Sequence, residues 1–147
     1  MEVNKNNTNS FNFKINILSI LLFFAIMPMG VYAQYSSVAV AKEYCIKALK
    51  NNDVESLVKG FSDPVEITLP ESENSYSKSQ AAMVLRKFMN NNKVKSFNVK
   101  QSGKSTGGSE FIIGDMTTTS GKQYQVYFLI TIINDEAFLH LIEFELI

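Results

Sequence analysis

The feature that most constrains this fold is a long apolar run near the C-terminus, at residues 123–133. Over residues 126–133 both faces of an extended segment would be apolar, which is typical of a strand that other elements cover on both sides. We therefore expect this segment to be the longest strand and to lie in the middle of a sheet. Three further strands are expected in the last third of the chain, at residues 95–101, 110–119 and 137–146.

Turn residues separate these strands and predict that they pair as antiparallel neighbours. Residues 121–122 and 134–135 have the composition of tight turns between strands. The segment 103–109 contains three glycines and is expected to be a flexible hairpin loop. The C-terminal half of the chain is therefore expected to form four consecutive strands of one sheet.

One isolated strand precedes them, at residues 65–69, where apolar and polar side chains alternate and Pro70 follows. A polar loop is expected after it, over residues 71–76. In the strand at residues 95–101 the same period-two rule predicts that Phe97 and Val99 face inward.

Three helices are predicted from apolar side chains at three- and four-residue spacing. Asn52 is expected to cap the second helix, and Gly60 to end it in a left-handed conformation. The third helix opens with an S-x-x-Q capping box at residues 77–80. The first helix follows Ser36 or Ser37 and reaches residue 51, the second lies between Asn52 and Gly60, and the third runs from Ser77 to Met89.

These elements predict an α+β fold in the order α-α-β-α-β-β-β-β. Consecutive antiparallel strands make a sheet that twists and curls. The apolar stripes of the three helices must be buried, and the concave face of that sheet is the large apolar surface available. We therefore expect a cone, in which a curved, mainly antiparallel sheet wraps around three N-terminal helices.

Residues 1–33 predict a cleavable signal peptide, removed after Ala33. A polar, lysine-containing start precedes an apolar stretch over residues 15–29, and the branched Val31 and the small Ala33 stand at the −3 and −1 cleavage positions. The alternative is an uncleaved membrane anchor, but the stretch is shorter than the roughly 20 residues that span a bilayer. The expected product is one domain at residues 34–147, periplasmic or secreted, with no membrane contact after cleavage.

Composition argues against several classes of function. The chain has 14 basic and 14 acidic residues, so no positive surplus predicts binding to nucleic acid. One histidine and one cysteine are too few for a zinc site, and no cofactor motif occurs. Cys45 cannot form an intramolecular disulfide and is expected to be a small buried residue.

Four segments together resemble a known family. They are Ala48-Leu49-Lys50-Asn51-Asn52-Asp53, Phe61-Ser62-Asp63-Pro64-Val65-Glu66-Ile67-Thr68-Leu69-Pro70, Tyr76-Ser77-Lys78-Ser79-Gln80-Ala81 and Gly121-Lys122-Gln123-Tyr124-Gln125-Val126-Tyr127-Phe128-Leu129. In the order of its predicted helices and strands the chain resembles the NTF2-like (cystatin-like, SnoaL-like) α+β cone, and more narrowly it resembles the DUF4783 family of exported Bacteroidetes proteins. The resemblance implies an extracytoplasmic domain, often dimeric through the open sheet face, and transfers no catalytic residue.

Two residues are candidate catalytic groups. Asp115 stands on a half-apolar strand face, where burial could raise its pKa and make it a base; the alternative is a solvated outer face. His140, the only histidine, is expected to share a strand face with Phe138, Ile142 and Phe144. No nucleophile motif accompanies it, which favours a structural strand histidine.

The preferred hypothesis is a non-catalytic module with an apolar pocket inside the cone that binds a small apolar ligand or a peptide. A second hypothesis is a homodimer that uses the outer sheet face. A third is a SnoaL-like isomerase or hydrolase with Asp115 or His140 as base, so that the chain is predicted more as a binding protein than as an enzyme. The expected pocket residues are Tyr44, Phe61, Met83, Phe88, Tyr127 and His140.

Overall fold

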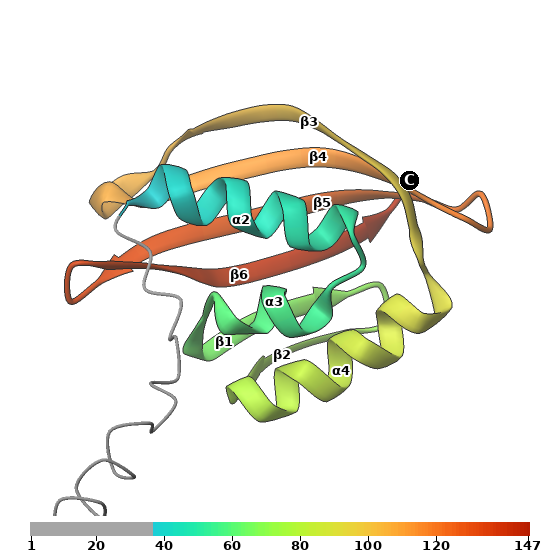
Figure 1. Ribbon diagram of the computed structural model, residues 1–147, viewed down its shortest axis with the longest axis horizontal. Coiled ribbons are helices and arrows are strands. Elements are labelled where there is room, and N and C mark those ends of the chain that lie inside the picture. The colour runs from blue at the N-terminus through green and yellow to red at the C-terminus, as the bar shows by residue number, and fades with distance from the viewer. Residues whose placement is uncertain (1–36) are drawn as a thin grey trace, which may run out of the picture. The chain divides into compact units, whose positions relative to one another are not determined.

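The computed structural model describes residues 37–147, where three helices cover one face of a curved six-stranded sheet (Figure 1). The predicted signal peptide at residues 1–33 lies outside the described residues. The sheet order is β2-β1-β6-β5-β4-β3. In chain order the elements are α2 (Val38–Lys50), α3 (Val54–Lys59), β1 (Phe61–Leu69), β2 (Ser72–Tyr76), α4 (Lys78–Asn91), β3 (Val94–Lys104), the 3-10 turn η1 (Thr106–Gly108), β4 (Glu110–Thr118), β5 (Gln123–Ile133) and β6 (Glu136–Leu146).

The strand at residues 123–133 lies inside the sheet, as predicted, between β4 and β6. All neighbouring strands pair antiparallel except β1 and β6, which are parallel. The prediction that both faces of β5 are covered is wrong for the described domain. Phe128 on the inner face is fully buried, whereas Tyr127 and Leu129 on the outer face are half-buried.

The structure contains one strand that the sequence did not predict. Residues 71–76 were expected to be a polar loop, but Ser72–Tyr76 pairs antiparallel with β1, from Leu69↔Ser72 to Val65↔Tyr76. Four of its five side chains are exposed, so no apolar alternation marks it, and backbone pairing defines it. This hairpin forms one edge of the sheet.

Local capping explains where the helices begin. The Ser37 side chain accepts from the Val40 N–H at the start of α2, and both hydrogen bonds of the predicted capping box join Ser77 and Gln80 at the start of α4. Asp53 caps α3 by accepting from the Ser56 N–H at 2.9 Å. These hydrogen bonds satisfy backbone donors that the first turn of a helix leaves free.

Two predicted helix details are wrong. Asn52 does not cap α3; it has a left-handed φ of 56°, and its amide bonds to both the N–H and the carbonyl of Val94. Gly60 is right-handed, with φ −81°. The side chain of Asn52 therefore joins the α2–α3 corner to the first residue of β3.

The core lies between the helices and the inner face of the sheet. Phenyl rings make up much of it, and four of them are almost fully buried. Gly114 lies against one of these rings, because a Cβ on it would meet the Phe97 ring at 2.6 Å. Within residues 37–147, no helix is both long and apolar enough to cross a membrane. The four rings are those of Phe61, Phe97, Phe128 and Phe144.

β-bulges change which side chains face inward. The register of β3 shifts after Val99, which pairs with Gly114 and so lies on the same face as Phe97, as predicted, although it is 43% exposed. In β6, Ile130 pairs with Leu139 while its neighbour Leu129 pairs with Leu141, so His140 is the extra residue. A bulge of this kind reverses the inward–outward alternation after it.

Candidate functional site

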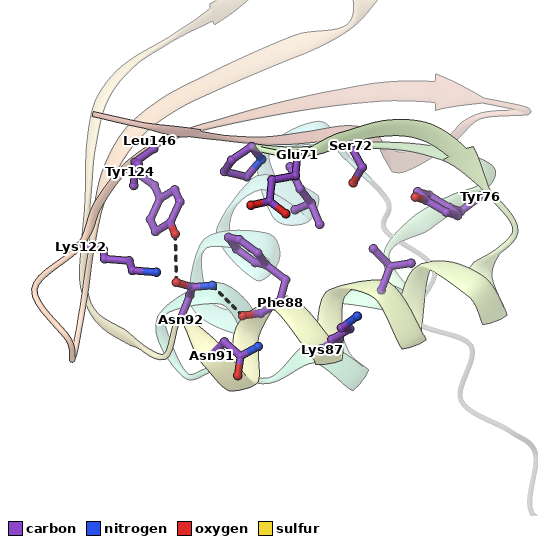
Figure 2. Close-up of a pocket in the computed structure, with 13 residues that line it drawn as sticks. Glu71, Ser72, Tyr76, Lys87, Phe88, Asn91, Asn92, Lys122, Tyr124 and Leu146 are labelled. Carbon is purple, nitrogen blue, oxygen red and sulfur yellow. Dashed lines mark hydrogen bonds between the residues drawn. The ribbon is translucent and has the colours of Figure 1, made fainter.

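A pocket of about 580 Å³ lies where the C-terminal half of α4 faces the β1–β2 hairpin and the ends of β5 and β6. We call it the mouth pocket, and Figure 2 shows its lining. Its lining residues are Val84, Lys87, Phe88, Asn91 and Asn92 from α4 and its C-cap, Leu69, Pro70, Glu71, Ser72 and Tyr76 from the hairpin, and Lys122, Tyr124 and Leu146 from the end of the sheet.

Aromatic rings form the inner wall of the mouth pocket. The Phe88 ring contacts Tyr124 edge-on, with ring centroids 5.6 Å apart, and lies 4.7 Å from the Phe144 centroid. Because Phe144 belongs to the core, the pocket wall is continuous with the packed interior. Rings that are held in this way offer a rigid apolar surface to a ligand.

A short hydrogen-bond chain holds the polar side of the wall. The Tyr124 hydroxyl donates to Asn92 Oδ1 at 2.9 Å, and Asn92 Nδ2 donates to the Phe88 carbonyl at 3.0 Å (Figure 2). Burial raises the pKa of the Tyr124 phenol above its ordinary value, because the charged form would be poorly solvated. These two hydrogen bonds connect the end of α4 to β5, and they engage the polar groups of the Tyr124 and Asn92 side chains.

Three charged side chains line the pocket near solvent. Lys87 comes from α4, Lys122 from the β4–β5 turn and Glu71 from the β1–β2 turn, and all three are exposed. Ion pairs such as Lys42–Glu110, Arg86–Glu55 and Lys100–Asp115 occur among residues 37–147, but none of these three charges belongs to one.

The six predicted pocket residues do not meet in one place. Phe88 lines the mouth pocket, whereas Phe61 is fully buried and lines a smaller hollow of about 300 Å³. Met83 is 61% exposed on α4, and Tyr44 packs half-buried against the core. Tyr127 lies on the outer sheet face and stacks on Phe111, and His140 is the bulge residue of β6.

The two candidate catalytic residues are far apart on the sheet. Asp115 on β4 pairs with Gln125, which pairs with Glu145 on β6, five residues along the strand from His140. At about 3.3 Å per residue this is roughly 16 Å along the strand, and two strand spacings add to it. Asp115 is in an ion pair with Lys100, Nζ to Oδ2 3.1 Å, near solvent. Because of this separation, Asp115 and His140 cannot act together on one substrate atom.

The environment of His140 differs from the prediction. It does not share a face with Ile142 and Phe144, because the bulge turns those two residues inward while His140 stays half-exposed. Its Nδ1 lies 3.1 Å from Ser62 Oγ, and that hydroxyl donates to the Pro64 carbonyl at 2.6 Å. The Ser62 hydroxyl has one proton, so it accepts from His140, the reverse of what a general base requires.

The remaining reactive groups do not add a catalytic centre to the described residues. Between residues 37 and 147, no three side chains of the His, Cys, Asp and Glu types gather as metal ligands. Cys45 is fully buried on α2, and burial raises the pKa of its thiol to about 12. A neutral, inaccessible thiol is a core residue, as predicted.

Sequence reasoning missed most of the mouth pocket. Its hairpin wall comes from the unpredicted strand β2, and Lys122 was interpreted as a turn residue only. One signal was present: the run of asparagines at residues 90–92 marks a helix end with side-chain amides, and Asn92 uses its amide to bridge α4 and Tyr124. The pocket wall therefore depends on contacts between residues distant in sequence.

The curved sheet, the helices on its inner face and the pocket at one end define an NTF2-like α+β domain. An NTF2-like protein of unknown function from Cytophaga hutchinsonii has the same fold: its TM-score is 0.55 at 13% identity, covering 76% of this chain and 90% of that one. The sequence profile described as "Domain of unknown function (DUF4783)" matches residues 43–145. The chain belongs to the DUF4783 family.

Solved members of that family are similar over the whole domain. A DUF4783 protein from Bacteroides ovatus is 28% identical, with a TM-score of 0.65, covering 71% of this chain and 93% of that one. Another, from Bacteroides uniformis, is 27% identical, with a TM-score of 0.66, covering 71% and 95%. No protein of curated function matches this chain. The resemblance expected from the sequence is confirmed for family and fold.

Proposed function

We propose that this protein is an exported, non-catalytic binding module whose mouth pocket takes a small ligand or short peptide with an apolar body. The observation that supports it is the volume of about 580 Å³ against the rings of Phe88 and Tyr124. Ligand pockets commonly measure about 300–1,000 Å³ and combine apolar walls with a few polar groups. The mouth pocket has both properties.

Two arguments favour binding over catalysis. The polar groups of Tyr124 and Asn92 are used in a structural hydrogen-bond chain, so they are not free to move a proton. Asp115 and His140 lie far apart, and neither lines the mouth pocket. Export is supported by the signal-peptide pattern of residues 1–33 and gives an extracytoplasmic protein, periplasmic or secreted.

A neutral fluorescent probe, phenylnaphthylamine, tests this proposal. Val84 is half-buried in the pocket wall, and Val84→Trp should fill the pocket and weaken probe binding about tenfold or more. Ile113→Trp adds the same ring on the outer sheet face and is the matched control, which should bind like the unchanged protein. Thermal unfolding of both variants checks folding. Equal probe binding by both variants would contradict the proposal.

A second candidate function, homodimerisation, is favoured by the apolar outer face of the sheet. Its half-buried side chains form a continuous patch over three adjacent strands, larger than a scatter of single apolar residues. A second copy with the same face would cover it, as in a two-fold dimer. The patch consists of Phe111, Ile113, Tyr127, Leu129 and Leu141.

Sedimentation of the purified protein tests the dimer. We expect a dimer for the unchanged chain and a monomer for Leu129→Glu, because a charge in the patch centre would be desolvated in the interface. Gln125→Glu introduces the same charge at an exposed position of β5 and should leave the dimer intact. A monomer at high concentration for the unchanged protein would count against this function.

A further inference from the structure

The charges of the mouth pocket indicate which ligand it prefers. Lys87 and Lys122 line the pocket from different elements, one on α4 and the other in the β4–β5 turn (Figure 2). Neither lysine side chain has an ion-pair or hydrogen-bond partner among residues 37–147. Lys42 and Lys100 pair with carboxylates and Lys78 lies over the Phe138 ring, but most lysines of the described domain have no such partner, so what distinguishes Lys87 and Lys122 is that both line one pocket.

The turn geometry helps to hold Lys122 at this place. Gly121 before it has a φ of 88°, which glycine adopts without strain, and its N–H donates to the Thr118 carbonyl at 3.0 Å. The Lys122 carbonyl then accepts from the Thr118 N–H at 2.9 Å, which closes the turn. Figure 2 shows the Lys122 side chain extending toward Asn92.

Glu71 is the third charge, and it has the opposite sign. It lies in the β1–β2 turn, is exposed, and has no ion-pair partner within the described range. Two positive charges and one negative charge leave an excess of one positive charge around an apolar wall. A ligand with one anionic group gains from both lysines, although Glu71 weakens this attraction.

We infer that the mouth pocket binds a small amphipathic anion, with an apolar body against Phe88 and Tyr124 and an acidic group between Lys87 and Lys122. This inference rests on the proposed binding function and adds the charge of the ligand to it. The acidic group stays near solvent, where the lysines are, so it keeps part of its hydration and its charge costs little to bind. The attraction should therefore weaken as salt increases.

Two probes with the same aromatic body separate charge from burial. Anilinonaphthalene sulfonate is anionic, and phenylnaphthylamine is neutral. Replacing both lysines, Lys87→Gln with Lys122→Gln, should weaken sulfonate binding about tenfold and neutral-probe binding less than about twofold. Glu71→Gln should strengthen sulfonate binding about twofold, with no effect on the neutral probe.

The matched control removes the same total charge elsewhere. Lys59→Gln with Lys104→Gln changes two exposed lysines that do not line the pocket, and both probes should bind it like the unchanged protein. If the two double variants bind the sulfonate equally well, the inference is overturned. The proposed function still holds in that case, provided that Val84→Trp blocks binding of the neutral probe. If Val84→Trp blocks neither probe, the proposed function and the inference both fail.

Discussion

The two faces of the curved sheet are built from the same residue types but differ in how tightly they are packed. On the inner face, Phe97 and Phe128 are almost fully buried, and their ring centroids lie 6.0 Å apart in an edge-on arrangement. On the outer face, Phe111 and Tyr127 are stacked with centroids 6.3 Å apart, yet both stay half-buried. Aromatic content alone therefore does not say which face is the core.

The glycines show the same difference. A Cβ on Gly114 would meet the Phe97 ring at 2.6 Å and the Asn98 carbonyl oxygen at 2.8 Å, on the inner face. A Cβ on Gly103 would meet the Phe111 ring at 2.9 Å, on the outer face. The inner ring is enclosed by the core, and the outer ring has open space on one side. The inner face is part of the packed core, whereas the outer face is a surface that a second protein copy could still cover.

The largest expected effect contrasts two neighbouring residues of β5. Phe128→Ala removes a fully buried ring and should lower the free energy of unfolding by about 3–5 kcal/mol. Tyr127→Ala removes a half-buried ring from the outer face and should cost about 1 kcal/mol. Urea unfolding of both variants measures the difference, and Phe128→Leu serves if the alanine variant does not fold. Equal losses would mean that the outer face is also covered.

A smaller effect is expected at the two glycines. Gly114→Ala should destabilise by about 1–3 kcal/mol, because the Phe97 ring and the backbone beside it have no room to move. Gly103→Ala should cost less than about 1 kcal/mol, because the far end of the Phe111 ring can swing away from it. Thermal unfolding under identical conditions compares them. A larger loss at Gly103 would show that Phe111 is held in place, as a dimer interface would hold it.

The sequence predicted the regular parts of this fold because local chemistry determines them. The capping box at Ser77 and the strand at residues 123–133 each need only neighbouring residues, and both are confirmed. The bulge at His140 and the strand β2 could not be predicted, because each depends on a partner strand. A one-residue shift in pairing was enough to place Ile142 and Phe144 on the opposite side from His140.

The candidate site was less predictable than the fold for the same reason. Phe88 was expected at the pocket, because its helix stripe is visible in the sequence, and it lines the mouth pocket. Tyr127 was expected there too, but strand parity places it on the outer face, and Tyr124 lies at the pocket instead. Which face of a strand is inner depends on packing of the helices, which a single sequence does not specify.

The last prediction, with an effect smaller than those at Phe128 and Gly114, concerns Tyr124, whose ring belongs to the inner face and whose hydroxyl reaches the mouth pocket. Tyr124→Phe removes the hydrogen bond to Asn92 Oδ1 and leaves that acceptor without its partner, which should cost about 1 kcal/mol at neutral pH. Asn92 keeps its bond to the Phe88 carbonyl, so the end of α4 should stay folded.

The pH dependence of the same variant identifies the cause. Burial raises the pKa of Tyr124 in the folded protein, so the folded state holds this proton more tightly than the unfolded state. The protonated Tyr124 hydroxyl contributes fully to the stability of the fold below the pKa of tyrosine in the unfolded chain, about 10. This contribution is lost as the pH rises through the higher pKa of Tyr124 in the folded protein. Urea unfolding at pH 8 and above pH 10 measures the difference in free energy of unfolding between the unchanged protein and Tyr124→Phe. This difference should become smaller as the pH rises. A difference in free energy of unfolding that does not change with pH would mean that water in the mouth pocket solvates the Tyr124 hydroxyl. The packed inner face would then extend only to the Phe88 ring.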